Sequence, residues 1–157
     1  MEEKLLISIV TAAYNSEKTI AQTIESVLNQ TYTNIEYIII DGLSSDGTVS
    51  IADSYRDKFT EKGISYRVVS EKDRGIYDAM NKGIRMAGGQ LIGLLNSDDW
   101  YEPVCAEVVA ETYLKEPFDM MYADLRMIKR DGSTGIKRAR LRDYVTTRDW
   151  NHPTTFL

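Results

Sequence analysis

The sequence predicts an open, doubly wound α/β fold, in which helices cover both faces of a mostly parallel sheet and give three layers, α/β/α. Two observations support this prediction. Four apolar runs alternate with four helical patterns along the chain. The runs are also apolar throughout instead of alternating with polar residues, which is typical of parallel strands buried on both faces. Because crossovers between parallel strands are right-handed, few topologies remain, and the doubly wound sheet is favoured.

Each element is justified by its local pattern. Buried strands are expected at residues 5–12, 35–40, 64–69 and 91–95, where β-branched and apolar residues cluster. The first expected helix is capped by Asn15 or Ser16 and runs to residue 28, and the second is capped by Asp46 and runs to residue 59. A third helix is expected over 75–87, and a fourth has Pro103 in its first turn. Residues 119–128 are expected to be extended, and Asp131-Gly132 is a hairpin signal before a strand at 133–136.

The charge is unevenly distributed along this chain of 157 residues, a length that fits one domain. Residues 125–148 hold eight basic and two acidic side chains, so this basic segment carries +6 while the rest of the chain carries −11. A solvated basic face is the first interpretation. Attraction to an anionic lipid surface or to a phosphate-bearing acceptor is the alternative. Nucleic acid is not an expected partner, because the acidic remainder would repel it.

The single cysteine and the chain's N-terminal residues indicate a cellular compartment. Cys105 has no second cysteine to pair with, which favours a reducing compartment, and its apolar helical setting favours a buried packing residue over a nucleophile. The apolar run 5–10 is too short to span a bilayer, and Glu2 and Glu3 before it do not fit a signal peptide. A cytoplasmic location is expected, with contact at the inner membrane face as a further hypothesis.

Polar residues gather where the predicted strands end. Residues 11–15 follow the first strand, Asp41 the second, residues 71–74 the third and residues 96–99 the fourth. The carboxyl ends of parallel strands share one edge, where open α/β sheets bind their ligands. Turn formation or helix capping is the alternative for each carboxylate taken singly. Carboxylates after three different strands favour a binding site.

The adjacent pair Asp98 and Asp99 indicates a cation site. Two neighbouring carboxylates repel each other unless a cation lies beside them. Mg²⁺ or Mn²⁺ binds through one or two carboxylates plus substrate phosphates, which suggests a nucleotide diphosphate as ligand. The chain has no G-x-x-x-x-G-K-[ST] and no G-x-G-x-x-G after its first strand. The metal and Arg74 would therefore have to balance the phosphate charge.

Four sequence blocks, in order and at matching spacing, resemble one known family. They are Ser8-Ile-Val-Thr-Ala-Ala-Tyr-Asn15, Asp41-Gly-Leu-Ser-Ser-Asp-Gly-Thr48, Asp73-Arg-Gly-Ile-Tyr-Asp-Ala-Met-Asn-Lys-Gly83 and Leu94-Leu-Asn-Ser-Asp-Asp-Trp100. Together they resemble the GT-A fold glycosyltransferases of family 2, over about the first 130 residues. The third block is most similar to bacterial members that build exopolysaccharide or O-antigen. The resemblance implies a Rossmann-like nucleotide-binding sheet.

The resemblance also implies roles for individual residues. Asp41 would accept a hydrogen bond from the base, Asp98 would bind the ribose, and Asp99 would hold Mn²⁺ or Mg²⁺ against the diphosphate. The remaining nucleotide-binding residues it implies are Thr11, Ala13, Tyr14, Asp73, Arg74 and Asn96. Asn81-Lys82-Gly83 has two equally weighted interpretations: it contacts the nucleotide-sugar donor, or it is a polar face of its helix.

The implied reaction is an inverting transfer of sugar from a nucleotide-diphosphate sugar, with UDP the family expectation, to a saccharide or lipid-linked acceptor. Only 58 residues follow Asp99, whereas the family's general base lies well downstream in an acceptor-binding half. Residues 1–157 are therefore expected to form a single GT-A nucleotide-sugar-binding domain without that half, with the base beyond Leu157. Asp124 is the fallback candidate within the chain. His152 is either a further metal ligand or a loop residue.

Two other functions remain as alternatives. A binding module that holds the nucleotide without transferring a sugar would fit a chain that lacks the acceptor half. A nucleotidyltransferase shares a similar sheet, but such enzymes open with a glycine-rich, basic loop after the first strand. This chain has Thr11-Ala-Ala-Tyr-Asn15 at that place, which makes the nucleotidyltransferase the weakest alternative.

Overall fold

The computed structural model describes residues 4–139 and 152–157, with the backbone alone for His152. The strands are β1 (Ile7–Ala13), β2 (Ile35–Asp41), β3 (Ser65–Ser70), β4 (Leu91–Asn96), β5 (Met121–Tyr122), β6 (Leu125–Ile128), β7 (Thr134–Lys137) and β8 (Thr155–Phe156). The helices are α1 (Ile20–Leu28), α2 (Thr48–Asp53), α3 (Arg56–Glu61), α4 (Ile76–Met86) and α5 (Cys105–Lys115), with a short 3₁₀ turn η1 (His152–Thr154).

The main sheet is doubly wound, which confirms the predicted fold class. Its six strands run in the order β3-β2-β1-β4-β8-β5, and β1 pairs in parallel with both β2 and β4. Along the chain, β2 and β3 are added on one side of β1, and β4 is then added on the other side. The strand order therefore reverses between β1 and β4. Thr11 stands opposite both Ile39 and Leu95, and the carboxyl ends of these strands form one edge. This reversal point is where a ligand site is expected.

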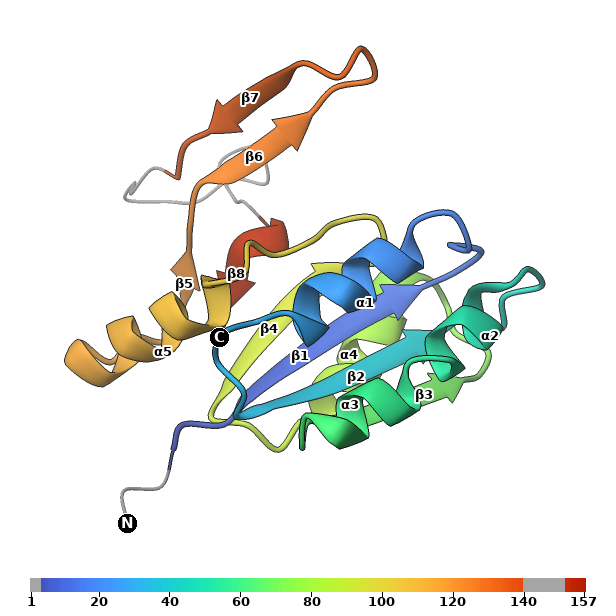
Figure 1. Cartoon of the computed structure of the whole chain (residues 1–157), viewed down its shortest axis with the longest axis horizontal. Helices are drawn as coiled ribbons and strands as arrows, with labels where there is room; N and C mark the ends of the chain where they lie inside the picture. The colour runs from blue at the N-terminus through green and yellow to red at the C-terminus, as the bar shows by residue number, and fades with distance from the viewer. Residues whose placement is uncertain (1–3, 140–151) are drawn as a thin grey trace.

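Helices cover both faces of the sheet (Figure 1). The larger apolar cluster joins the sheet to α1, α2, α3 and α5, and the smaller one joins it to α4. Successive residues of β1 alternate between them, since Ile9 belongs to the larger cluster and Val10 to the smaller. Strands β1 and β2 are thus buried on both faces along their whole length.

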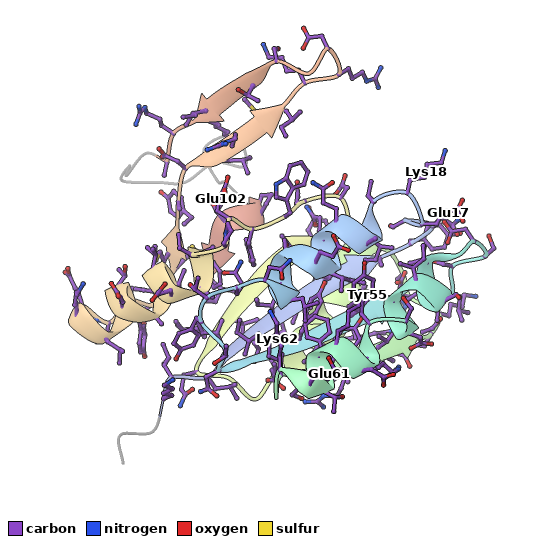
Figure 2. The ribbon with its side chains drawn as sticks, viewed as in Figure 1. Glu17, Lys18, Tyr55, Glu61, Lys62 and Glu102 are labelled. Carbon is purple, nitrogen blue, oxygen red and sulfur yellow. The ribbon has the colours of Figure 1, made fainter. Side chains whose placement is uncertain are left out.

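Polar contacts tie the helices of the larger layer together. The Tyr55 hydroxyl, just before α3, donates to Glu25 of α1 at 2.8 Å. Lys62 Nζ, just after α3, donates to the carbonyl oxygen of Leu28 at 2.6 Å. Figure 2 labels Tyr55 and Lys62 in the layer that α1 and α3 share. Helix α1 is therefore anchored along the side that faces α3.

Two elements differ from the sequence prediction. The expected helix over 46–59 is divided into α2 and α3, because the hydrogen-bond ladder tightens between them: the Tyr55 N–H bonds to the carbonyl of Ala52, three residues back. The extended segment at 119–128 is divided between two sheets, with β5 in the main sheet and β6 in a hairpin with β7. The hairpin signal at Asp131-Gly132 is confirmed, and Gly132 has a φ of 81° there.

Strand β8 gives the sheet its antiparallel part. It lies between β4 and β5 and runs antiparallel to both, with Phe156 opposite Gly93 and Met121. The β6–β7 hairpin projects away from the main sheet (Figure 1). In the part of the chain that the structure describes, no helix has the length and apolar character needed to cross a membrane.

Candidate functional site

A pocket of about 800 Å³, here called the edge pocket, opens at the carboxyl edge of the sheet. It lies where the strand order reverses, between the end of β1 and the loop after β4. The loops after β2 and β3 and the first turns of α4 complete it. Its lining residues are Ala12, Ala13, Tyr14, Gly42, Leu43, Lys72, Asp73, Gly75, Ile76, Ala79 and Ser97. The structure thus brings together all four strand ends that the sequence singled out.

The edge pocket combines an apolar rim with charged groups. Tyr14, Leu43 and Ile76 are exposed there, with Tyr14 66% accessible. Asp73 supplies a carboxylate, whose Oδ1 accepts a hydrogen bond from the Gly75 N–H at 2.8 Å. A side chain on Gly42 would place its Cβ 2.5 Å from Asp73 Oδ2, so glycine at this position leaves room for the carboxylate. An aromatic surface beside hydrogen-bonding groups suits a planar, polar ligand.

The wall that carries Asp73 is anchored by Lys82 of α4. Lys82 Nζ donates to the carbonyl oxygen of Lys72 at 2.7 Å and pairs with Glu71 at 2.9 Å. The next residue, Gly83, packs so closely on β1 that a Cβ would lie 2.2 Å from Val10 Cγ1. Lys82 and Gly83 therefore hold α4 and the loop after β3 in place, and the two roles weighed for this block in the sequence stay predictions.

The side chains of Thr11 and Asp41 lie outside the lining of the edge pocket. Thr11 is fully buried, and its hydroxyl shares a hydrogen bond of 3.0 Å with the Tyr37 hydroxyl in the larger apolar cluster. Asp41 is 1% exposed, and its carboxylate accepts from the Ser44 N–H at 3.0 Å, the Ser70 hydroxyl at 2.6 Å and the Ser44 hydroxyl. Both side chains lie on the α1 side of the sheet and outside the lining of the edge pocket.

The alternation of side chains along a strand turns both residues toward the larger cluster. Thr11 follows Ile9 and Asp41 follows Ile39 on the face of the larger cluster, whereas Ala12 points to the α4 side. Asp41 thus orders the loop after β2, the turn role that the sequence left open. A direct contact of Asp41 with a base stays a prediction.

Asn15 joins the loops after β1 and β2. Its φ is 48°, its N–H donates to the Ser44 hydroxyl at 2.8 Å, and its side-chain oxygen accepts from the Ser45 N–H at 2.9 Å. The next residue, Ser16, donates through its N–H to the Thr48 hydroxyl at 2.7 Å. These contacts fix the peptide that carries Tyr14 into the edge pocket.

A second pocket of about 650 Å³, here called the α5 pocket, is lined in part by the residues that follow Ser97. Asp98 and Asp99 line it together with Trp100, residues of α5 and β6, and the segment before β8. Ser97 lines the edge pocket, so the two pockets flank one short loop after β4.

The groups after β4 fit a divalent cation. Asp98 is exposed, and no Lys or Arg of the described residues forms an ion pair with it. Asp99 is half-buried, and its Oδ2 accepts from the neutral Asn96 amide at 3.0 Å. Within residues 4–139 and 152–157, no three His, Cys, Asp or Glu side chains group as an all-protein metal site. Two carboxylates that leave coordination positions for phosphate oxygens are the arrangement Mg²⁺ favours.

The other candidates lie apart from this loop. Asp124 lines the α5 pocket, but its Oδ1 accepts from the Ala139 N–H at 2.8 Å and its Oδ2 lies 3.6 Å from Arg138. Arg74 is exposed and does not line the edge pocket; its N–H donates to Asp78 at 3.1 Å. The side chain of His152 falls outside the described residues.

Cys105 behaves as a packing residue. It is half-buried beside the α5 pocket, and burial, followed by the nearby Glu102 carboxylate, raises the pKa of its thiol to about 12. The thiol is therefore protonated at neutral pH and is a poor nucleophile. This agrees with the role that the sequence favoured.

Sequence reasoning missed Lys72. It lines the edge pocket beside Asp73 and is the basic residue that the structure places there, in the position expected for Arg74. The signal was present, because Lys72 belongs to the same loop after β3 as the residues that were singled out. Spacing alone did not separate the two neighbouring basic residues.

Comparison with known proteins agrees with this geometry. The model of the family described as "Glycosyl transferase family 2" matches residues 8–156, nearly the whole chain. The chain belongs to glycosyltransferase family 2. This confirms the predicted family and the class of enzyme.

A chondroitin synthase from Escherichia coli is similar in sequence to this family 2 chain. The two are 36% identical over 129 residues, which cover 82% of this chain and 18% of that protein. A putative glycosyltransferase, EpsH, from Bacillus subtilis is 36% identical over 106 residues, covering 68% of this chain and 30% of that protein. The chain thus spans less than a third of the length of these relatives.

Solved structures share the fold. S. aureus TarS, residues 1–349, in complex with UDP-GlcNAc has a TM-score of 0.68 at 23% identity, covering 76% of this chain and 34% of that chain. The mannosyltransferase PcManGT from Pyrobaculum calidifontis, in complex with GDP-Man and Mn²⁺, has a TM-score of 0.67 at 21% identity, covering 78% and 36%. At these identities the likeness shows the fold alone.

Proposed function

We propose that this chain binds the nucleotide-sugar donor of an inverting glycosyltransferase along the edge where β1 and β4 meet. The observation that carries the proposal is the position of the loop after β4, with Ser97 in the edge pocket and Asp98 and Asp99 in the α5 pocket. The nucleoside would occupy the edge pocket, the diphosphate would cross at Ser97, and the sugar would extend toward the α5 pocket.

The family and the fold support this assignment. Members of family 2 are glycosyltransferases, and structures with the same fold hold UDP-GlcNAc in TarS and GDP-Man with Mn²⁺ in PcManGT. Uridine is the base we propose for this chain, with guanosine and thymidine as the alternatives.

The residues of the edge pocket have distinct parts in binding. Tyr14 and Ile76 would pack against the base, and Asp73 would accept a hydrogen bond from it, because Asp73 is the carboxylate that lines this pocket. Lys72 is placed to attract the phosphates from the rim, and Arg74 to add positive charge nearby. Asp41 and Thr11 act at longer range by fixing the loops and strands that carry these groups.

Asp98 and Asp99 would hold Mn²⁺ or Mg²⁺. When bound, such an ion acts as a Lewis acid that stabilises the negative charge on a departing nucleoside diphosphate. Asp99 is held by Asn96, and Asp98 is open to solvent at the mouth of the α5 pocket.

The acceptor belongs to the proposal as well. We assign it to the α5 pocket side, as a saccharide or lipid-linked group, since Asp98, Asp99 and Trp100 face that pocket. The general base that deprotonates the acceptor would lie in an acceptor-binding portion outside these residues. Asp124 is a weaker choice, because its carboxylate already bonds to Ala139 and pairs with Arg138.

Contact with an anionic membrane surface is a proposal that rests on the basic segment. Within the described residues, this segment places Arg126, Lys129, Arg130, Lys137 and Arg138 on or beside the β6–β7 hairpin; its remaining basic residues fall outside them. Two of these side chains form ion pairs within the protein, Arg126 with Glu102 and Arg138 with Asp124. Sedimentation with phosphatidylserine vesicles should exceed that with phosphatidylcholine vesicles; equal sedimentation would refute the contact.

Calorimetric titration with UDP, GDP and dTDP, with and without Mn²⁺, tests the proposed donor site. We expect one nucleotide, UDP, to bind more tightly when Mn²⁺ is present. Asp99→Asn should remove that gain, because an amide is a weak ligand for a hard cation, while thermal stability stays close to that of the wild type. A metal-dependent affinity that survives in Asp99→Asn would refute the assignment of the cation to this residue.

A further inference from the structure

Helix α1 and the turn after it carry a stripe of polar side chains that faces the loop after β4. Thr23 and Ser26 lie one turn apart on α1, and Gln30 lies two residues beyond its last residue, Leu28. Thr23 and Gln30 are only 1% and 4% exposed. The apolar stripe of the same helix packs in the larger cluster with the sheet. Helix α1 therefore serves two surfaces, of which only the apolar one is needed to cover the sheet.

Two hydrogen bonds from described residues hold Asp99. The Thr23 hydroxyl donates to its backbone carbonyl at 2.8 Å. The Asn96 side-chain amide donates to its carboxylate Oδ2 at 3.0 Å. The first bond fixes the peptide plane after the Asp99 Cα atom, and the second fixes the direction of the side chain. Together they restrict where the carboxylate can lie.

The residues after Asp99 are held by the same stripe. The Tyr101 N–H donates to the Ser26 hydroxyl at 3.2 Å, and the Ser26 hydroxyl donates to the Thr23 carbonyl at 2.7 Å. Gln30 uses both ends of its amide, donating to the Glu102 carbonyl and accepting from the Ala106 N–H, each at 2.9 Å. Glu102, labelled in Figure 2, lies beyond Tyr101 on this loop.

These contacts do more than satisfy buried groups. The buried backbone groups of a loop need hydrogen-bond partners, and here side chains of α1 and of the turn after it supply them. Because Thr23 and Ser26 lie at a fixed spacing on α1, the loop has one register against the helix. Ligands of a cation must be held to within about 0.5 Å, and outer contacts commonly provide that precision.

We propose that Thr23, Ser26 and Gln30 are positioning residues that fix Asp99 for cation binding. The inference rests on the proposed function, which assigns the cation to Asp98 and Asp99. It goes further in making the cation affinity depend on α1, whose side chains touch neither the edge pocket nor the α5 pocket.

The test compares Thr23→Val with Thr23→Ser. Valine keeps the shape of threonine but removes the donor to Asp99, while serine keeps the hydroxyl. The quantity to measure by calorimetry is the ratio of the UDP Kd without Mn²⁺ to the UDP Kd with Mn²⁺. We expect Thr23→Val to lower this ratio about tenfold with the metal-free Kd unchanged, and Thr23→Ser to keep the wild-type ratio.

Thr60→Val on α3 is the matched control, since the Thr60 hydroxyl donates to the carbonyl of Arg56 at 3.0 Å far from the loop. It should leave the ratio unchanged. Ser26→Ala provides a second variant, with a smaller expected loss, if Thr23→Val does not fold. A variant of Thr23 or Ser26 that melts at lower temperature but keeps the wild-type ratio would overturn the inference and leave the proposed function intact. A wild type without any Mn²⁺ effect, or an Asp99→Asn variant that keeps the effect, would overturn both.

Discussion

Glu36 is a buried carboxylate that stabilises the fold and lies outside both pockets. Its side chain, near the start of β2, accepts hydrogen bonds from the Ser8 hydroxyl at 2.5 Å and the Gly88 N–H, and it pairs with Arg67 at 2.8 Å. Burial raises the pKa of the Glu36 carboxyl, but these hydrogen bonds and the Arg67 charge lower it by more, so the net pKa lies below its ordinary value. The carboxylate thus links three strands and the turn after α4.

The depressed pKa of Glu36 makes part of the stability depend on pH. Between the folded pKa and the unfolded value of about 4.3, the unfolded chain binds more protons at this site. The stabilisation is therefore complete above the unfolded pKa and is lost as the pH falls through the folded pKa. We expect Glu36→Gln to lower the free energy of unfolding by about 1–3 kcal/mol at neutral pH, with a smaller difference in acid.

Urea denaturation of wild type and Glu36→Gln between neutral and acidic pH measures this effect. Glu61→Gln is the matched control, because Glu61 is exposed at the end of α3 (Figure 2). It should follow the wild type at every pH. The same difference between wild type and Glu36→Gln at all pH values would contradict the linkage.

Lys82 gives a prediction about binding. Since Lys82 anchors Glu71 and the Lys72 carbonyl, Lys82→Met should let the wall that carries Asp73 move. We expect UDP affinity to fall roughly threefold to tenfold, on the order of 1 kcal/mol, without a change in the effect of Mn²⁺. Calorimetry checks both quantities. Lys115→Met, which removes an exposed charge on α5, should bind UDP like the wild type.

The sequence could place residues at strand ends but could not assign them to a face. Asp73, Asp98 and Asp99 lie at the predicted edge because they follow the ends of β3 and β4 within three residues. Thr11 and Asp41 point to the α1 side and do not line the edge pocket, and their contacts with a nucleotide stay predictions. In β1 and β2 both faces are buried, so apolar residues occupy successive positions and no alternation reveals the inward and outward directions.

At the scale of elements, α4 owes its position to a glycine. Alanine normally stabilises a helix by about 1 kcal/mol relative to glycine. At Gly83, however, a Cβ would lie 2.2 Å from Val10 Cγ1, so α4 would have to move away from β1. We expect Gly83→Ala to lower the free energy of unfolding by about 1–3 kcal/mol and to weaken UDP binding, because α4 carries one side of the edge pocket.

Gly135→Ala on β7 is the control for this change, since nothing lies within 4 Å of its added Cβ. Thermal and urea unfolding of both variants measure the effect. A Gly83→Ala variant as stable as the wild type would show that α4 and β1 adjust without cost.

Element prediction succeeded where the chain had a strong period and failed where tertiary contacts decide. The helix at 75–87 matches α4 within a residue at each end, because apolar residues recur along one side and glycines follow it. The division of residues 119–128 between β5 and β6 depends on β8, which joins the sheet from far along the chain. No local pattern contains that pairing.

At the scale of the whole molecule, the reversal of strand order explains why the site lies where it does. Strand β2 is added on one side of β1 and β4 on the other, so the chain leaves these strands in opposite directions. The loops after them therefore diverge and leave the edge pocket open. The loop after β4 then separates this pocket from the α5 pocket. A nucleotide sugar that spans both pockets must pass Asp98 and Asp99.

The central claim is that the donor crosses this loop with a cation at Asp98 and Asp99. Crystals grown with UDP and Mn²⁺, measured for anomalous scattering from manganese, test it most directly. The account predicts one manganese peak roughly 2 Å from carboxylate oxygens of this pair, with the uracil ring beside Tyr14 and the diphosphate between them. Manganese bound away from Asp98 and Asp99, or a uracil ring outside the edge pocket, would contradict it.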